Sequence, residues 1–285
     1  MGGPPSTGQA AKRDPEERSH EEKRRNVALE VLLALWSFPR GPLVEIGMVA
    51  SLAFSTLVWA LRPPYRGRLL IAAMEFVGVQ SIFIVGLTGT FTGMVFGLQL
   101  VYSLRQFGAE NTVGGVVALA LSRELAPVFT GLMVTSRAGS SMATELGTMR
   151  VTDQIDALAT MAVNPVQYLV VPRVIAGILT VPALCMLFNV VGMFGAYVVS
   201  VYLLSLDPGV FVARMSWQAD GADIMQGLVK SAVFGGTIAL VACRQGFYAS
   251  GGAAGVGQAT TRAVVQSSVA ILVLNYFITS LMTSL

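Results

Sequence analysis

The sequence predicts an all-α integral membrane protein that crosses the bilayer five times. Hydrophobic residues make up 54% of the 285-residue chain, charged residues make up only 12%, and the mean hydropathy is +0.66. Several apolar windows approach the ~20 residues that a helix needs to cross ~30 Å of hydrocarbon. Lipid offers the backbone no hydrogen-bond partners, so these windows are expected to be helical. A soluble enzyme is a poor alternative, and little length remains for a second folded domain.

The charged residues indicate topology rather than nucleic-acid binding. The net charge is only +3. Ten of the nineteen basic residues lie within the first 68 positions: Lys12, Arg13, Arg18, Lys23, Arg24, Arg25, Arg40, Arg62, Arg66 and Arg68. This asymmetry is typical of the positive-inside bias and of contact with anionic headgroups. Two cysteines in apolar runs and one histidine in the polar start exclude a zinc site, a catalytic Cys/His pair and a disulfide framework.

The N-terminal part divides into two predicted regions. Residues 1–26 are rich in Gly, Pro and charge, which predicts a disordered cytoplasmic tail without a cleavable signal peptide. Residues 27–38 and 43–61 are apolar, but basic residues flank the second run on both sides, which disfavours a crossing. We therefore expect 27–70 to be an interfacial helical region, with its helices broken at Pro39 and Pro42.

The permease-like part, residues 71–285, contains the five expected spans. They lie near 76–104, 114–138, 172–203, 228–248 and 266–284. A cytoplasmic N-terminus then places 139–171 and 249–265 inside and the C-terminus outside, in agreement with the distribution of Lys and Arg. The outer segment from Asp207 to Asp223 resembles a short amphipathic helix on the far surface. No internal repeat is visible, so an inverted-repeat transporter has little support.

Small residues line one face of the first span. Gly89, Gly93 and Gly97 recur every four positions, a spacing that lets another helix approach closely. Packing within one subunit and a face toward a second subunit or a substrate cavity are equally compatible with this pattern. Gln99 and Tyr102 follow on a mostly apolar surface suited to acyl chains.

The glycine-rich segment from Gly251 to Thr261 resembles a phosphate-binding loop only superficially. A Walker A loop needs Lys and then Ser or Thr after its last glycine, whereas Gln258 and Ala259 stand there. We expect a flexible cytoplasmic turn into the last span instead.

Arg123 and Glu124 are ionisable residues at the outer end of the second span. Each charge there costs a few kcal/mol unless it is paired or hydrated. Adjacent helical residues point ~100° apart, so the two need not pair with each other. One interpretation is a hydrated cavity or a neighbouring subunit; the alternative is a salt bridge that locks helices together. Pro127, one turn further, frees a backbone carbonyl near Arg123.

A polar island covers residues 139–173 between long apolar runs. The three-residue spacing of Arg150, Asp153 and Asp156 predicts one charged helical stripe, with Met149, Ile155 and Leu158 as apolar contacts elsewhere. Such a helix suits a groove in a cytosolic partner, and a merely solvated loop is the alternative.

The motifs of residues 75–285 together resemble the MlaE/YrbE family of permease subunits, which belong to lipid-transporting ABC systems with MCE-domain proteins. The matching segments are 93–99, 123–127, 137–140, 145–155, 164–165, 172–173, 230–231 and 259–265. The resemblance implies a homodimer in the cell inner membrane, with N-terminal interfacial helices, five transmembrane helices per subunit and a cytoplasmic coupling helix. It also implies a separate ATPase that holds ATP and Mg, a periplasmic MCE partner, and a role in outer-membrane lipid asymmetry. The first 70 residues match poorly.

The residue patterns and the resemblance together assign two sets of site residues. Lipid binding is assigned to Gly93, Gly97, Gln99, Phe107, Arg123 and Glu124. ATPase coupling is assigned to Glu145, Arg150, Asp153, Gln154 and Asp156.

The sequence therefore predicts a permease subunit that moves phospholipid to or from a periplasmic carrier and is not itself an enzyme. No cofactor or metal is expected in this chain. Two alternatives stay open: a secondary transporter that works alone, for which Glu124 is the one candidate coupling carboxylate, and a membrane scaffold that anchors an MCE ring.

Overall fold

The computed structural model describes residues 40–63 and 66–284, and within these ranges every regular element is a helix. The chain forms two compact units, Met1–Ser51 and Leu52–Leu285. The predicted tail 1–26 and the apolar run 27–38 lie outside the described residues. The all-α fold class predicted from composition is confirmed.

Helix α2 extends from Arg40 to Ala60 and contains Pro42 in its first turn. The predicted break at Pro42 is therefore wrong. The first backbone N–H groups of a helix have no intrahelical acceptor, so a proline there loses no hydrogen bond. Pro39 lies outside the described residues.

Five helical runs in the second unit are long and apolar enough to cross a membrane, which confirms the predicted number of spans. They are Gly67–Arg105, Glu110–Val151, Val166–Leu203, Gly221–Phe247 and Gly252–Ser284. Each predicted span overlaps one of these runs. The first combines α3 (Gly67–Val77) with α4 (Ile82–Arg105), and the third contains α9 (Val171–Tyr197).

The second run is a single helical path built from three α-helices joined by π-helical turns. The α-helices are α5 (Val113–Ala120), α6 (Ala126–Val134) and α7 (Ser140–Val151). The π turns are Leu121–Leu125 and Thr135–Gly139. Helix α7 thus continues the path through the first part of the predicted polar island. π turns inside α-helices are frequent at functional sites.

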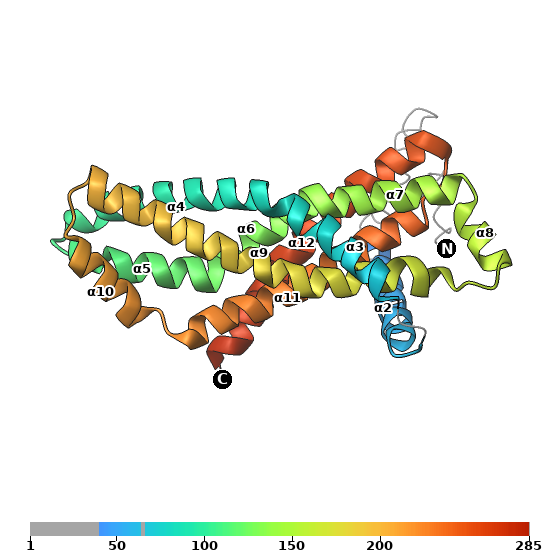
Figure 1. Cartoon of the computed structure of the whole chain (residues 1–285), viewed down its shortest axis with the longest axis horizontal. Helices are drawn as coiled ribbons and strands as arrows, with labels where there is room; N and C mark the ends of the chain where they lie inside the picture. Colours follow the sequence, from blue (N-terminus) through green and yellow to red (C-terminus); the bar gives the residue numbers. More distant parts are fainter. Residues whose placement is uncertain (1–39, 64–65, 285) are drawn as a thin grey trace, which may run out of the picture. The chain divides into compact units, whose positions relative to one another are not determined.

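The glycine face of α4 packs against α9 of the same chain. A side chain on Gly93 would overlap the backbone of Gly192, and one on Gly97 would press on Ala196. Helix α9 also contacts α3, α6 and α11 (Gly221–Phe247), and it lies among them in Figure 1. Of the two interpretations of the glycine pattern, the structure supports packing within one subunit.

Two short helices lie at opposite ends of the second unit (Figure 1). Helix α8 (Gln154–Thr160) connects α7 to the start of the third run, and α10 (Pro208–Gln218) precedes α11. The Asp207 side chain caps α10 by accepting a hydrogen bond from the Val210 N–H at 2.9 Å. The predicted short helix after Asp207 is therefore present, although it ends before Asp223, which belongs to the first turn of α11.

Helix α12 extends from Gly252 to Ser284, much further than the predicted span 266–284. Gly251 and Gly252 have φ values of 93° and 65°, so the turn is confined to Gly251 and the first residue of the helix. Gly255 and Gly257 lie within α12. The expectation of a flexible turn across the whole glycine-rich segment is wrong, because an uninterrupted series of helical hydrogen bonds outweighs the modest helix penalty of single glycines.

Candidate functional site

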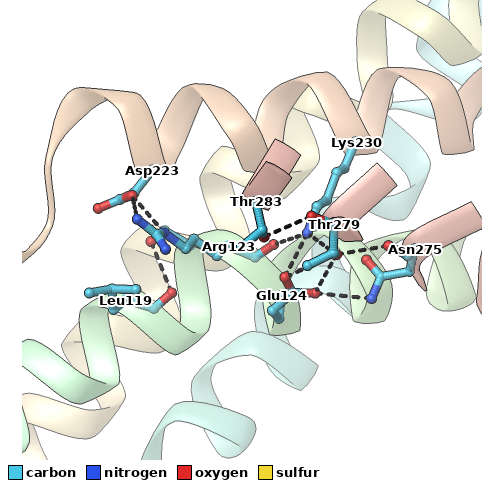
Figure 2. A network of polar contacts seen from close by, with 9 residues as sticks. Leu119, Arg123, Glu124, Asp223, Lys230, Asn275, Thr279 and Thr283 are labelled. Carbon is cyan, nitrogen blue, oxygen red and sulfur yellow. Dashed lines mark hydrogen bonds and ion pairs between the residues drawn. The ribbon is translucent and has the colours of Figure 1, made fainter. Parts of the chain in front are cut away.

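The π turn Leu121–Leu125 presents Arg123 and Glu124 to two different sets of partners (Figure 2). Arg123 reaches the start of α11, whereas Glu124 reaches the middle of α11 and the last part of α12. The expectation that adjacent residues need not pair with each other is confirmed. The two side chains connect three of the five long helical runs.

Arg123 pairs with Asp223. Arg123 Nε donates to Asp223 Oδ1 at 2.6 Å, and a second guanidinium nitrogen lies 2.5 Å from the same oxygen. The Asp223 side chain is only 6% exposed and the Arg123 side chain 44%. The other oxygen of this carboxylate, Oδ2, accepts the Asp220 N–H at 3.1 Å. The Asp223 side chain therefore both caps the start of α11 and pairs with Arg123.

Glu124 pairs with Lys230, whose side chain is fully buried. Lys230 Nζ lies 2.7 Å from Glu124 Oε1, 2.9 Å from the carbonyl oxygen of Arg123 and 2.8 Å from Thr279 Oγ1. These contacts use all three donors of the ammonium group. Asn275 Nδ2 donates to Glu124 Oε2 at 3.0 Å, so both carboxylate oxygens have partners. A buried charge is tolerated under such full pairing.

Pro127 explains why the Arg123 carbonyl is available. In an α-helix this oxygen would accept the N–H of the residue four positions later, but proline has none. Lys230 donates to it instead. The predicted free carbonyl is thus present, and its partner comes from another helix.

Within this chain, Arg123 and Glu124 each form a salt bridge to α11. These contacts support the alternative interpretation, in which salt bridges lock helices together. Part of the network still faces outward, because the Glu124 side chain is 38% exposed and that of Arg123 44%. Thr279 also lines an open hollow of about 420 Å³ with Tyr276, Ser280, Thr283 and Ser284. The network is therefore accessible along one side of α12.

The structure does not bring the other predicted lipid-binding residues to this network. Gly93 and Gly97 are buried against α9 and leave no space for a lipid. Gln99 is exposed on α4, and Phe107, just beyond the end of α4, is 81% exposed. These two side chains remain accessible, whereas the two glycines serve helix packing.

The predicted charged stripe of the polar island is interrupted by a break between two helices. Asp153 has a left-handed conformation with φ 58° and separates α7 from α8. Arg150 and Asp156 nevertheless meet across this break, with 2.6 Å between Arg150 Nη1 and Asp156 Oδ1. The expectation of one continuous helical stripe is wrong, because Asp is one of the few non-glycine residues that readily adopt the left-handed conformation.

The exposed surface of α8 is mixed, because Ala157 and Ala159 are exposed beside its polar residues and Met161, directly after the helix, is 65% exposed. Asp153, Gln154 and Asp156 are exposed, whereas Ile155 is 2% exposed and anchors the helix to the second unit. Ile155 is therefore unavailable as an apolar contact for a partner. Glu145 lies further back on α7, where its carboxylate is 2.9 Å from Arg173 of α9.

The sequence reasoning missed four residues that complete the network. Asp223, Lys230, Asn275 and Thr279 supply the partners of Arg123 and Glu124. Lys230 carried a usable signal, because a lone cation near an apolar span requires a counter-ion and Glu124 is a carboxylate at a similar depth. Asn275 and Thr279 carried no comparable signal.

Five long apolar helical runs and an ion-paired network between three of them define a multi-pass membrane protein. Residues 70–281 match the sequence model of the family described as Permease MlaE. The chain belongs to this family, as its motifs predicted.

Curated relatives agree with this assignment. The chain is 42% identical over 237 residues to a probable ABC transporter permease protein of Rickettsia felis, covering 83% of this chain and 92% of the relative. It is 36% identical over 241 residues to the intermembrane phospholipid transport system permease protein MlaE of Haemophilus influenzae, covering 83% and 91%. It is also 35% identical over 265 residues to the chloroplastic protein TRIGALACTOSYLDIACYLGLYCEROL 1 of Arabidopsis thaliana, covering 93% and 75%.

Proposed function

We propose that this chain is the permease subunit of an ABC transporter that moves phospholipid between the cell inner membrane and a periplasmic MCE-domain carrier. A separate cytoplasmic ATPase binds ATP and Mg and supplies the energy. Two copies of the chain form the permease, with the N-terminus in the cytoplasm and the C-terminus in the periplasm. Family membership and the names of the curated relatives support the transport class and the phospholipid substrate.

One observation carries the mechanism. The helical path from Glu110 to Val151 holds Arg123 and Glu124 about a third of the way along and ends just before α8. A movement imposed on α8 is therefore transmitted along a continuous helix to the network that links α11 and α12. Close-packed helices transmit such shifts because they have few voids to absorb them.

At the α8 end, the exposed residues fit a docking contact with the ATPase. Asp153, Gln154 and Asp156 present two carboxylates and an amide on the surface of the short helix. Arg150 fixes Asp156, and the Glu145–Arg173 ion pair ties α7 to α9 behind the contact. Asp153, Gln154 and Asp156 contact the ATPase, and the two ion pairs hold these residues in place.

At the network end, the partly exposed Arg123 fits the phosphate of a lipid headgroup. A guanidinium group binds phosphate in a bidentate manner while its stem stays in apolar surroundings. Exposed apolar residues on α4, including Phe91, Val95 and Tyr102, together with Gln99 and Phe107, supply a surface for acyl chains or for the second subunit.

Purification of the tagged chain with its genomic neighbours tests this proposal. We expect an ATPase and an MCE-domain protein to copurify with phospholipid bound to the complex. A stand-alone secondary transporter would instead move lipid without either partner and would depend on an ion gradient. A scaffold would copurify with the MCE protein but would show no ATP-dependent lipid movement. Either of these last two results would overturn the proposal.

A further inference from the structure

A hollow of about 120 Å³ lies between the corner after α2 and the start of the third helical run. Its lining includes Trp59, Arg62 and Arg66 from the segment before α3, Leu70 from α3, and Tyr168 and Ile175 from the third helical run. Basic, aromatic and apolar side chains thus converge on one small space at the α8 end of the second unit.

The two arginines are held against aromatic rings and not against carboxylates. The Arg62 guanidinium lies 5.3 Å from the ring centre of Trp59, and that of Arg66 lies 4.8 Å from the ring centre of Tyr168. Among the described residues, no ion pair involves either arginine. Stacking on an aromatic face leaves the N–H donors at the edge of a guanidinium free for an anion.

Hydrogen bonds fix the two sides of the hollow relative to each other. Gln167 Nε2 donates to the carbonyl oxygen of Arg62 at 2.9 Å. Asn164 Oδ1 accepts the N–H groups of Val166 at 2.9 Å and of Gln167 at 3.2 Å, which holds the connector that follows α8. The segment before α3 and the segment after α8 are therefore joined to each other beside the hollow.

The position of the hollow fits the boundary between headgroups and hydrocarbon. The first membrane-spanning run begins at Gly67, directly after Arg66. Trp and Tyr concentrate at this depth in membrane proteins, and Leu70 and Ile175 continue toward the apolar segments. The volume is well below the ~300–1,000 Å³ of sites that enclose a whole ligand, so it suits a phosphate group whose acyl chains stay outside.

We propose that this hollow binds the headgroup phosphate of an anionic phospholipid that remains with the chain and is not the transported lipid. Arg62 and Arg66 bind the phosphate, and Leu70 and Ile175 contact the start of an acyl chain. The site lies at the α8 end, whereas the Arg123–Glu124 network contacts the start of α11 and the end of α12. The bound lipid stabilises the joint through which α8 continues into α9.

Native mass spectrometry of the full-length chain in detergent tests this site by counting bound lipid during titration with phosphatidylglycerol or phosphatidylcholine. We expect Arg62→Gln/Arg66→Gln to lower the affinity for phosphatidylglycerol by roughly tenfold or more, because charge-assisted hydrogen bonds are lost. Arg68→Gln is the control: it removes an exposed charge two residues after Arg66, in the first turn of α3, and Arg68 does not line the hollow. Equal affinity of the double variant and the wild type for phosphatidylglycerol would overturn the proposal.

A second measurement needs no variant. We expect phosphatidylglycerol to stay bound to the wild-type chain in an excess of inorganic phosphate, because the acyl contacts add to the phosphate contacts. Displacement of the lipid by inorganic phosphate would indicate a free-anion site, and equal binding of phosphatidylcholine would indicate no anionic selectivity. Either result would contradict the proposal. Neither measurement requires an ATPase or lipid transfer, so both are independent of the proposed transport function.

Discussion

Lys230 and Glu124 form an ion pair between α11 and the π turn of the second helical run, with 2.7 Å between Nζ and Oε1. The Lys230 side chain is completely buried, and its counter-ion is 38% exposed. A buried ammonium group is tolerated only with full hydrogen bonding, which Glu124, Thr279 and the Arg123 carbonyl provide. This pair therefore holds the helices of the polar network together.

We expect Lys230→Met to destabilise the chain by roughly 3 kcal/mol, the lower part of the range for breaking a buried ion pair, because Glu124 keeps some access to water. Thermal unfolding in detergent measures the effect. Glu124→Gln/Lys230→Met is the control, since it removes both charges and is expected to recover most of the loss. If Lys230→Met alone were as stable as the wild type, the Lys230–Glu124 ion pair would contribute little to the stability of the chain.

The same double variant separates structure from transport. Glu124→Gln/Lys230→Met is expected to assemble with the ATPase, because it leaves no uncompensated charge. Its rate of lipid transfer is expected to fall at least about tenfold if the partly exposed Glu124 carboxylate takes part in headgroup handling, a loss of ~1.4 kcal/mol in the transition state. Normal transfer by an assembled double variant would restrict the pair to a structural role.

Gly93→Leu is expected to destabilise the α4–α9 contact by about 1–3 kcal/mol or more, because the new side chain would overlap the backbone of Gly192. Gly86→Leu on the same helix is the matched control, since nothing lies within 4 Å of its added Cβ. The yield of folded protein and its unfolding temperature measure the difference. Similar losses in both variants would contradict the close contact.

Asp156→Lys is expected to abolish copurification of the ATPase without preventing membrane insertion, because Asp156 is exposed on α8. Glu110→Lys is the control: it breaks a comparable exposed ion pair, Arg105–Glu110 at 2.7 Å, at the other end of the helical path. The Asp153→Lys/Asp156→Lys variant extends the same test. Recovery of the ATPase at normal yield from the double variant would rule out a docking role for these carboxylates.

Composition and apolar length were sufficient to predict the all-α class and the five spans, because the bilayer imposes both. Local backbone conformation was harder to predict. Pro42 lies at the start of a helix and not at a break, and the left-handed Asp153 ends the helix inside an apparent helical stripe. Both depend on where the helix ends, which residue spacing does not specify.

The candidate site was predicted only in part. The cost of burying charge identified Arg123 and Glu124, but their partners lie about 100 to 155 residues away in α11 and α12. Tertiary packing alone brings these residues together. The glycine pattern of α4 likewise predicted a close contact but not the identity of the facing helix.

Transfer of labelled phospholipid from vesicles containing the assembled complex to the purified MCE carrier tests the central claim most directly. We expect transfer that requires ATP, that stops when the ATPase is inactivated, and that is absent when this chain is omitted. Transfer at the same rate without ATP, or no transfer by an assembled complex that hydrolyses ATP, would contradict the assignment of this chain as the permease of an ATP-driven phospholipid transporter.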